Sequence, residues 1–122
     1  MTETHASDPT VAYADAPSLL AEIRWVAVQS RSVRDAMNRE FWLRKAAVFD
    51  RIAIKEATTS ASAATGKASA TTAARAARQL VEYDAVHHGL SLRGADLATD
   101  EECRAYARQA YSAWRSSGLQ HF

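Results

Sequence analysis

The stretch from residue 32 to residue 57 constrains the fold of this chain more than any other feature. It reads SVRDAMNREFWLRKAAVFDRIAIKEA, contains neither Gly nor Pro, and is rich in residues of high helix propensity. Ser32 followed by Asp35 resembles a capping box, in which a Ser or Thr and an acidic residue three positions later bind each other's backbone amides. The run therefore predicts one helix of roughly six to seven turns, which is longer than the usual globular helix.

Apolar side chains lie on two sides of this predicted helix when successive residues are placed 100° apart. One stripe comprises Val33, Met37, Phe41, Val48 and Ile52, widened by Trp42 and Phe49, and the roughly opposite one comprises Ala36, Leu43, Ala47 and Ile54. A surface helix needs one apolar stripe, so a helix with two is expected between two sets of neighbours. We expect its own chain to cover one side, and either more of the same chain or a partner to cover the other.

Charged residues on the same helix are spaced so that some attract and some repel. Asp35 and Arg39, and likewise Glu40 and Arg44, are four residues apart and of opposite charge, whereas Arg51 and Lys55 at the same spacing repel each other. The chain as a whole has a net charge of only +1. This near-neutral balance makes neither nucleic acid nor an acidic substrate an obligatory partner.

The rest of the chain favours an all-α fold. Its 122 residues amount to one domain. It has only four Gly and two Pro, and no run shows strand alternation. We expect a small helical bundle of about four helices, with the long central helix and a low-complexity linker.

We divide the chain into a disordered N-terminal tail at residues 1–15, one helical domain at residues 16–118 and a short tail at residues 119–122. A first helix is expected to open at Pro17 and to run to about Gln29, followed by a corner; one unbroken helix over residues 18–57 is the alternative. Residues 58–72, TTSASAATGKASATT, are interpreted as a flexible linker, with a loop clamped between helices as the alternative. Removing residues 1–14 is expected to leave the thermal midpoint nearly unchanged.

Two further helices are expected in the second half. One begins at Thr71 or Thr72 and ends before Gly89, and the other begins at the capping box formed by Thr99 and Glu102. On the last helix one apolar line is expected to be buried, namely Cys103, Ala107, Ala110 and Trp114. The flexible linker predicted at residues 58–72 would also allow the two halves of the chain to dock across subunits, which would make an intertwined dimer.

Three segments resemble small uncharacterised proteins of actinobacterial genomes. They are FWLRKAAVFDRIA (residues 41–53), AARQLVEYDAVHHGL (residues 76–90) and RAYARQAYSAW (residues 104–114), about a third of the chain. The resemblance implies a bacterial, helical protein, and it implies no activity and no site.

No motif predicts catalysis, a cofactor or a metal. Asp84 and His88 have the spacing of two ligands on one helix face, but a structural zinc site needs four, so we interpret them as a hydrogen-bonded acid and a capping His. Cys103 lies on an apolar line and is interpreted as a buried hydrophobe. A single cysteine cannot form an internal disulfide, and residues 1–17 lack the pattern of a signal peptide, so a cytoplasmic location is expected, without membrane association or a small-molecule substrate.

Protein binding through the central helix is the function that the sequence favours. The helix has two apolar sides to cover, and the residues expected to contact a protein partner or a second copy are Phe41, Trp42, Leu43, Ala47 and Ile54. The alternative is a nucleic-acid-associated regulator, which would use Arg34, Arg44, Lys45, Arg51, Lys55, Arg75 and Arg78. Binding to nucleic acid would weaken steeply with salt, whereas an apolar interface would not.

Overall fold

The computed structural model describes residues 9–14, 16–31, 38–59, 62–87 and 99–119. Within these ranges the chain forms helices and no strands, which confirms the predicted all-α class. The helices are α1 (Pro9–Ala12), α2 (Leu19–Gln29), α3 (Arg39–Thr58), α4 (Ala63–His87) and α6 (Asp100–Leu119). None of these helices combines the length and the apolar character needed to cross a membrane.

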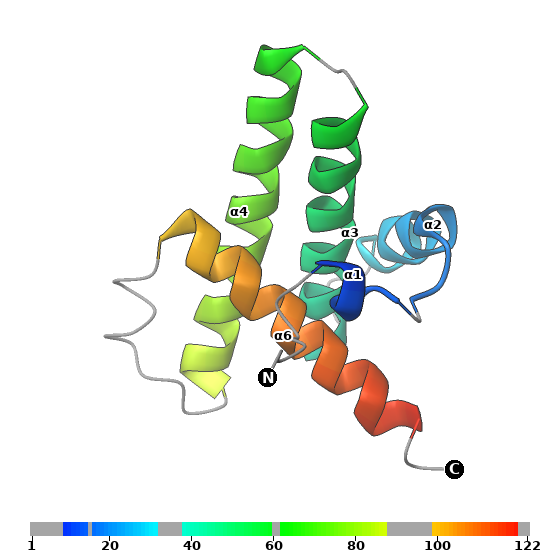
Figure 1. Ribbon diagram of the computed structural model, residues 1–122. Coiled ribbons are helices and arrows are strands. Elements are labelled where there is room, and N and C mark those ends of the chain that lie inside the picture. The colour runs from blue at the N-terminus through cyan, green and yellow to red at the C-terminus, as the bar shows by residue number, and fades with distance from the viewer. Residues whose placement is uncertain (1–8, 15, 32–37, 60–61, 88–98, 120–122) are drawn as a thin grey trace, which may run out of the picture.

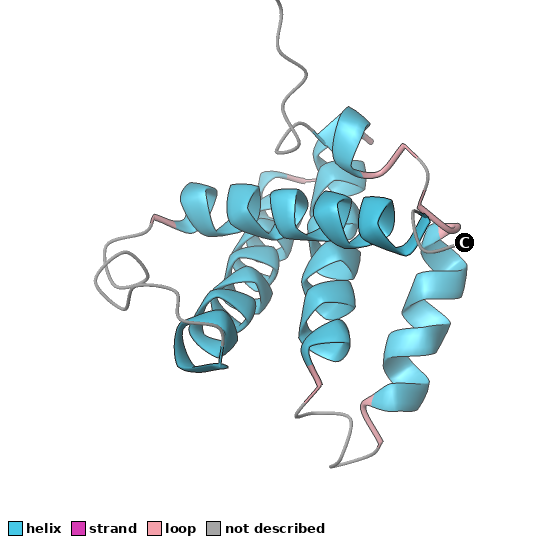
Figure 2. Ribbon diagram, turned by 90° about the horizontal axis from the view of Figure 1, so that it is seen from below, coloured by secondary structure: helices cyan, strands magenta, loops and turns pink. Residues whose placement is uncertain are grey.

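Helices α3 and α4 form an antiparallel hairpin, and α6 crosses it (Figure 1). The view from below shows the same crossing, with α2 on the flank of α3 (Figure 2). The core lies where α3, α4 and α6 meet and consists mainly of small side chains around Leu43, Leu80 and Tyr111. The central helix thus has neighbours on more than one side, and the neighbours belong to its own chain.

Helices α2 and α3 are separate, as the predicted corner requires. The backbone of Asn38 is extended, with φ −97° and ψ 131°, and its side chain accepts a hydrogen bond from the amide of Glu40 at 2.7 Å. Asn38 therefore caps α3, and the alternative of one unbroken helix over residues 18–57 is wrong. The prediction of one helix over residues 32–57 is wrong at its start, because the extended backbone of Asn38 places the first residue of α3 at Arg39. Ser32 itself lies outside the described residues.

The low-complexity patch is largely helical, which differs from the linker interpretation. Helix α4 begins at Ala63, and the hydroxyl oxygen of Ser62 accepts a hydrogen bond from the amide of Thr65 at 3.1 Å. Alanine is the best helix former, and small side chains let two helix axes approach closely. Further along α4 the alanines that become buried are Ala73, Ala74, Ala76 and Ala77. A patch of small residues that resembles a linker is here the first part of a long packed helix.

Helix α6 begins at the capping box that the sequence predicts. The Thr99 amide donates to the Glu102 carboxylate at 2.7 Å, and the Glu102 amide donates to the Thr99 hydroxyl oxygen at 3.1 Å. Cys103 and Ala107 of the predicted apolar line are fully buried, and Ala110 and Trp114 pack partly buried against the core.

The segment around α1 packs on the domain, contrary to the expectation of a disordered tail through residue 15. Ala12 is buried, and the Tyr13 hydroxyl donates to the Asp50 carboxylate at 2.7 Å. The Tyr13 ring also lies 5.5 Å from the ring of Tyr111, measured between centroids. Residues 1–8 lie outside the described residues, so the expectation for a tail stays a prediction there.

We predict that Tyr13→Phe lowers the free energy of unfolding by about 1 kcal/mol, because Asp50 loses one hydrogen-bond donor in a buried site. For a chain of this size the thermal midpoint should fall by about 4 °C. Removal of residues 1–14 should lower it further, since α1 is lost too; this replaces the expectation from the sequence that the midpoint stays nearly unchanged. A truncation of residues 1–8 alone, which keeps Tyr13, is the control. Equal midpoints for wild type and the longer truncation would contradict the packing of this segment.

Candidate functional site

Three carboxylates lie inside the protein, one on each of three helices. Glu22 of α2, Asp50 of α3 and Asp84 of α4 are almost fully buried. A charge removed from water is costly unless it is paired and hydrogen-bonded. In each of the three cases an arginine and a tyrosine from other parts of the chain satisfy the carboxylate.

The Asp50 carboxylate joins α3 to α6. The Arg108 guanidinium binds it through two hydrogen bonds, of 2.7 and 3.0 Å, and the Nε of Arg104 donates to Oδ1 at 2.7 Å. The Tyr13 hydroxyl completes the set. These contacts fix the line along which α6 crosses the hairpin.

The Asp84 carboxylate joins α4 to the start of α3. Arg39 binds it through two hydrogen bonds of 2.8 and 2.9 Å, and the Tyr106 hydroxyl of α6 donates to Oδ2. Asp84 is thus hydrogen-bonded, as the sequence interpretation required, and His88 lies outside the described residues. No group of three metal-ligating side chains occurs in the part of the chain that the structure describes.

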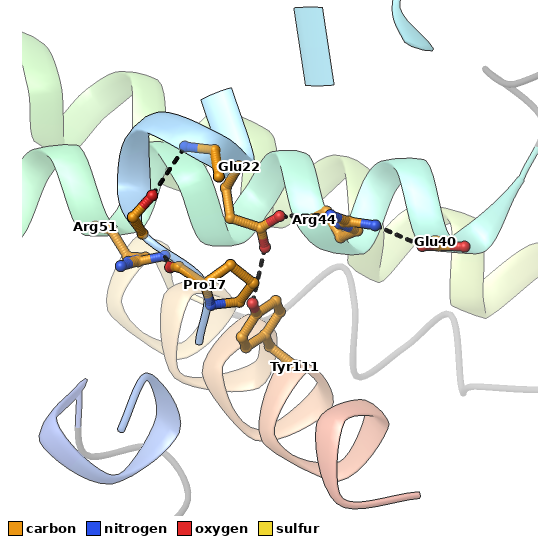
Figure 3. Close-up of polar contacts among 8 residues, drawn as sticks. Pro17, Glu22, Glu40, Arg44, Arg51 and Tyr111 are labelled. Carbon is orange, nitrogen blue, oxygen red and sulfur yellow. Dashed lines mark hydrogen bonds and ion pairs between the residues drawn. The ribbon is translucent and has the colours of Figure 1, made fainter. Parts of the chain in front are cut away.

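The Glu22 carboxylate joins α2 to both α3 and α6 (Figure 3). Arg44 Nη2 donates to Oε2 at 2.6 Å, and the Tyr111 hydroxyl donates to Oε1 at 2.8 Å. Arg44 also binds Glu40, the predicted neighbour four residues away, at 2.7 Å, and its guanidinium lies 3.7 Å from the centroid of the Trp25 ring. Arg44 is therefore held on several sides and orients α2.

Helix α2 is oriented so that several of its large apolar residues face away from the core. The only buried residue of α2 is Glu22, whereas Leu20, Ile23 and Val28 keep 58%, 36% and 58% of their surfaces exposed. We define the α2 outer face as the exposed residues Leu20, Ile23, Arg24, Ala27, Val28 and Arg31. It is the candidate interaction surface, because three of the four large apolar side chains that are exposed in the described chain lie on it.

The residues predicted to bind a partner through the central helix are divided between the core and the surface. Phe41, Leu43 and Ala47 are buried within the chain itself, and Leu43 and Ala47 contribute to the α3–α4–α6 core. Trp42 and Ile54 are half-buried. The opposite apolar line of α3 is thus covered by the same chain at Leu43 and Ala47, which leaves them no surface for a partner.

Most of the arginines predicted for nucleic-acid binding have partners inside the molecule. Arg44 binds Glu22 and Glu40, Arg51 donates to the backbone carbonyl of Pro17 at 2.9 Å, and Arg78 pairs with Asp100 at 3.4 Å. Of the other predicted residues, Lys55 and Arg75 are exposed, Lys45 lies over the rings of Phe41 and Trp42, and Arg34 is outside the described residues. Three of the six described residues, Arg44, Arg51 and Arg78, are thus held by contacts within the chain.

Cys103 is fully buried, and burial raises the pKa of its thiol. The raised pKa disfavours the thiolate, which is the nucleophilic form. The position agrees with the interpretation of Cys103 as a buried hydrophobe.

Sequence reasoning did not identify Glu22 or Tyr13 as residues with buried polar contacts. Eight of the eleven residues of α2 are apolar, LLAEIRWVAVQ, and they lie all around the helix. Periodicity alone cannot select the inner face of such a helix. The feature of the sequence that distinguishes one side of α2 from the other is its single acidic residue, Glu22, which lies on the same side as Trp25.

Comparison of the chain with protein-family models, with curated proteins and with solved structures finds no match.

We predict that Glu22→Gln lowers the free energy of unfolding by about 3 kcal/mol or more, because Arg44 loses its buried counter-charge. Glu40→Gln is the matched control, since Glu40 binds the same guanidinium from a half-exposed position; its loss should cost less than about 1 kcal/mol. Urea unfolding followed by circular dichroism measures both. Equal costs would show that burial of Glu22 is not what stabilises α2.

We further predict that the protein loses stability in alkali as its buried tyrosines ionise. Burial and the hydrogen bond to Asp84 raise the pKa of Tyr106 to about 12, and burial raises the pKa values of Tyr13 and Tyr111 as well. A raised folded-state pKa gives stability that is complete below the unfolded value near 10 and is lost as the pH rises through the folded value. Each such tyrosine lowers the free energy of unfolding by at most about 1.4 kcal/mol per pH unit in that window.

Absorbance at 295 nm and circular dichroism, recorded together from neutral pH upwards, check this prediction. Tyrosine ionisation and loss of helix should coincide, and Tyr106→Phe should reduce the slope. Ionisation of all tyrosines in a protein that stays helical would contradict it.

Proposed function

We propose that this chain is a non-enzymatic helical interaction module that binds a protein partner through the α2 outer face. The observation that carries the proposal is the orientation of α2, which buries its acidic residue Glu22 and exposes Leu20, Ile23 and Val28. Apolar surface residues scattered singly need no explanation. Three of them within nine residues of one helix are a group and not single scattered residues.

The patch supplies binding energy that the folded chain leaves unused. Full burial of a Leu, Ile or Val side chain contributes about 1.5–3 kcal/mol. Leu20 and Val28 keep more than half of their surfaces exposed, so roughly half of that amount is available from each on association. Residues spaced three, four and seven apart, as Leu20, Ile23 and Ala27 are, suit a helix that packs against another helix or into a groove.

The charge of the α2 outer face indicates the chemistry of its partner. The only charged residues of the α2 outer face are Arg24 and Arg31, which form no ion pair among the described residues, while Glu22 points inward. A second copy would bring these positive charges against their own counterparts in a two-fold interface. We therefore propose an acidic amphipathic helix of another protein, whose apolar stripe covers Leu20 and Ile23 and whose flanking carboxylates reach Arg24 and Arg31.

Two other occupants fit less well. A nucleic acid would gain nothing from the aliphatic centre of the face, and Arg44 and Arg78, two of the residues expected to bind it, are already paired with carboxylates. An interfacial membrane helix usually carries aromatic anchors on its apolar side. The single aromatic residue of α2, Trp25, lies instead against Arg44.

The proposed function is the one that the sequence favours, but the proposed binding surface lies on α2 instead of α3. Trp42 and Ile54 of α3 are half-exposed and stay outside the proposed contact. The proposed setting is the cytoplasm, in line with the single free thiol of Cys103.

We predict that a library of displayed 20-residue helical peptides, selected on the wild-type protein, yields acidic amphipathic sequences. The double variant Leu20→Asp/Val28→Asp serves for counter-selection. In fluorescence anisotropy the best peptide should bind the double variant at least about tenfold more weakly, since about 1.4 kcal/mol of apolar contact is lost. Arg24→Glu/Arg31→Glu should also weaken it, and more so at low salt.

Val86→Asp on α4, which places the same change at another exposed valine, is the matched control and should bind as wild type does. Circular dichroism must show that all variants remain folded. The proposal fails if the selected peptides are not acidic or if they bind the Leu20→Asp/Val28→Asp variant equally well. It also fails if the α2 substitutions instead abolish a homodimer seen by light scattering, or binding to anionic vesicles or duplex DNA.

A further inference from the structure

A cleft of about 370 Å³ lies where α3 meets α2 and the N-terminal segment. Pro9, Tyr13 and Leu19 line one part of it, and Arg51, Ile54 and Lys55 of α3 line the other. Its volume falls at the lower end of the range of small-molecule sites, which is roughly 300–1,000 Å³. No residue of the α2 outer face lines this cleft, so the two surfaces are separate.

Two positively charged side chains line the cleft. Arg51 and Lys55 are four residues apart on α3, so they share one side of the helix and repel each other. The Arg51 guanidinium donates to the Pro17 carbonyl at 2.9 Å (Figure 3). It also lies 5.6 Å from the centroid of the Tyr13 ring, so it is held in place. This leaves Nε and Nη2 of Arg51 without a hydrogen bond among the described residues.

Among the residues that the structure describes, no acidic side chain lines the cleft. Glu56, which is adjacent to Lys55, accepts a hydrogen bond from the Ser69 hydroxyl of α4. Asp50, which is adjacent to Arg51, is buried and is bound by Arg104, Arg108 and Tyr13. Its charge is therefore already more than matched by arginines. An anion that entered the cleft would relieve the repulsion between Arg51 and Lys55 without competing with a carboxylate of the protein.

Apart from Thr10, the remaining described lining of the cleft is mainly apolar. Pro9, Leu19 and Ile54 contribute aliphatic surface, and Tyr13 contributes its ring, because its hydroxyl points to Asp50. The cleft thus combines two cationic side chains with aliphatic and aromatic surface, which suits an amphipathic anion.

We propose that this cleft binds a small organic carboxylate with a hydrocarbon body. The carboxylate lies between Arg51 and Lys55, where the planar guanidinium suits its two oxygens. The hydrocarbon body packs on Leu19, Ile54 and the Tyr13 ring. The site goes beyond the proposed protein-binding function, does not depend on it, and departs from the sequence-based expectation of no small-molecule substrate.

The test uses the full-length ¹⁵N-labelled protein and four defined probes: hexanoate, phenylacetate, hexanol and inorganic phosphate. Hexanoate and phenylacetate should shift the amide signals of Tyr13, Leu19 and Ile54 saturably, with a dissociation constant of about 1 mM for ligands of this size. Hexanol lacks the charge and should bind at least about tenfold more weakly, because charge-assisted hydrogen bonds are lost. Phosphate lacks the hydrocarbon and should also bind more weakly.

Lys55→Gln should weaken hexanoate binding by about tenfold, as expected when one charged contact is lost. Lys67→Gln, which changes an exposed lysine of α4, is the matched control and should leave binding unchanged. The proposal is overturned if no saturable shift occurs, if hexanol or phosphate binds as tightly as hexanoate, or if Lys55→Gln binds as wild type does. Amide signals of Ile23 and Val28 should not move, so the result is independent of the α2 outer face.

Discussion

The need to neutralise three buried carboxylates governs how the helices of this protein are arranged. Asp50, Asp84 and Glu22 lie on three different helices, and α6 supplies a tyrosine or an arginine to each of them. An unpaired charge at any of these positions would cost several kcal/mol, which is a large fraction of the stability of a small domain. Helix α6 must therefore cross α3 and α4 at the place where its side chains reach all three acids.

The apolar core alone would specify the arrangement less well. Its helices meet largely through alanines, and an alanine surface offers few bulky side chains to select one register over another. Ion pairs add little net stability compared with apolar residues of the same volume, but an alternative packing that breaks them leaves charges uncompensated. The bidentate contact of Arg39 with Asp84 and that of Arg108 with Asp50 therefore act mainly by excluding other arrangements.

Local pattern predicted local features well and long-range features poorly. The Thr99 capping box and the Glu40–Arg44 pair involve residues three or four apart, and both are present in the structure. Arg39 instead binds Asp84, which is 45 residues away, and nothing in the sequence near Arg39 identifies that partner. The alanine-rich start of α4 was misread because its small side chains reflect close helix packing, which a single sequence does not distinguish from a flexible composition.

The orientation of α2 shows how a polar contact determines which face is left for binding. A rotation of α2 by about half a turn would bury Leu20 and Ile23 and expose Glu22 to water. Burial of the two apolar side chains would favour this rotated orientation. The rotation would also leave Arg44 and Tyr111 without Glu22 in a site closed to water. That penalty exceeds the gain from two half-buried aliphatic residues. The buried ion pair therefore holds α2 with its apolar side outward, and an exposed apolar patch is a direct consequence of the way in which the interior charges are paired.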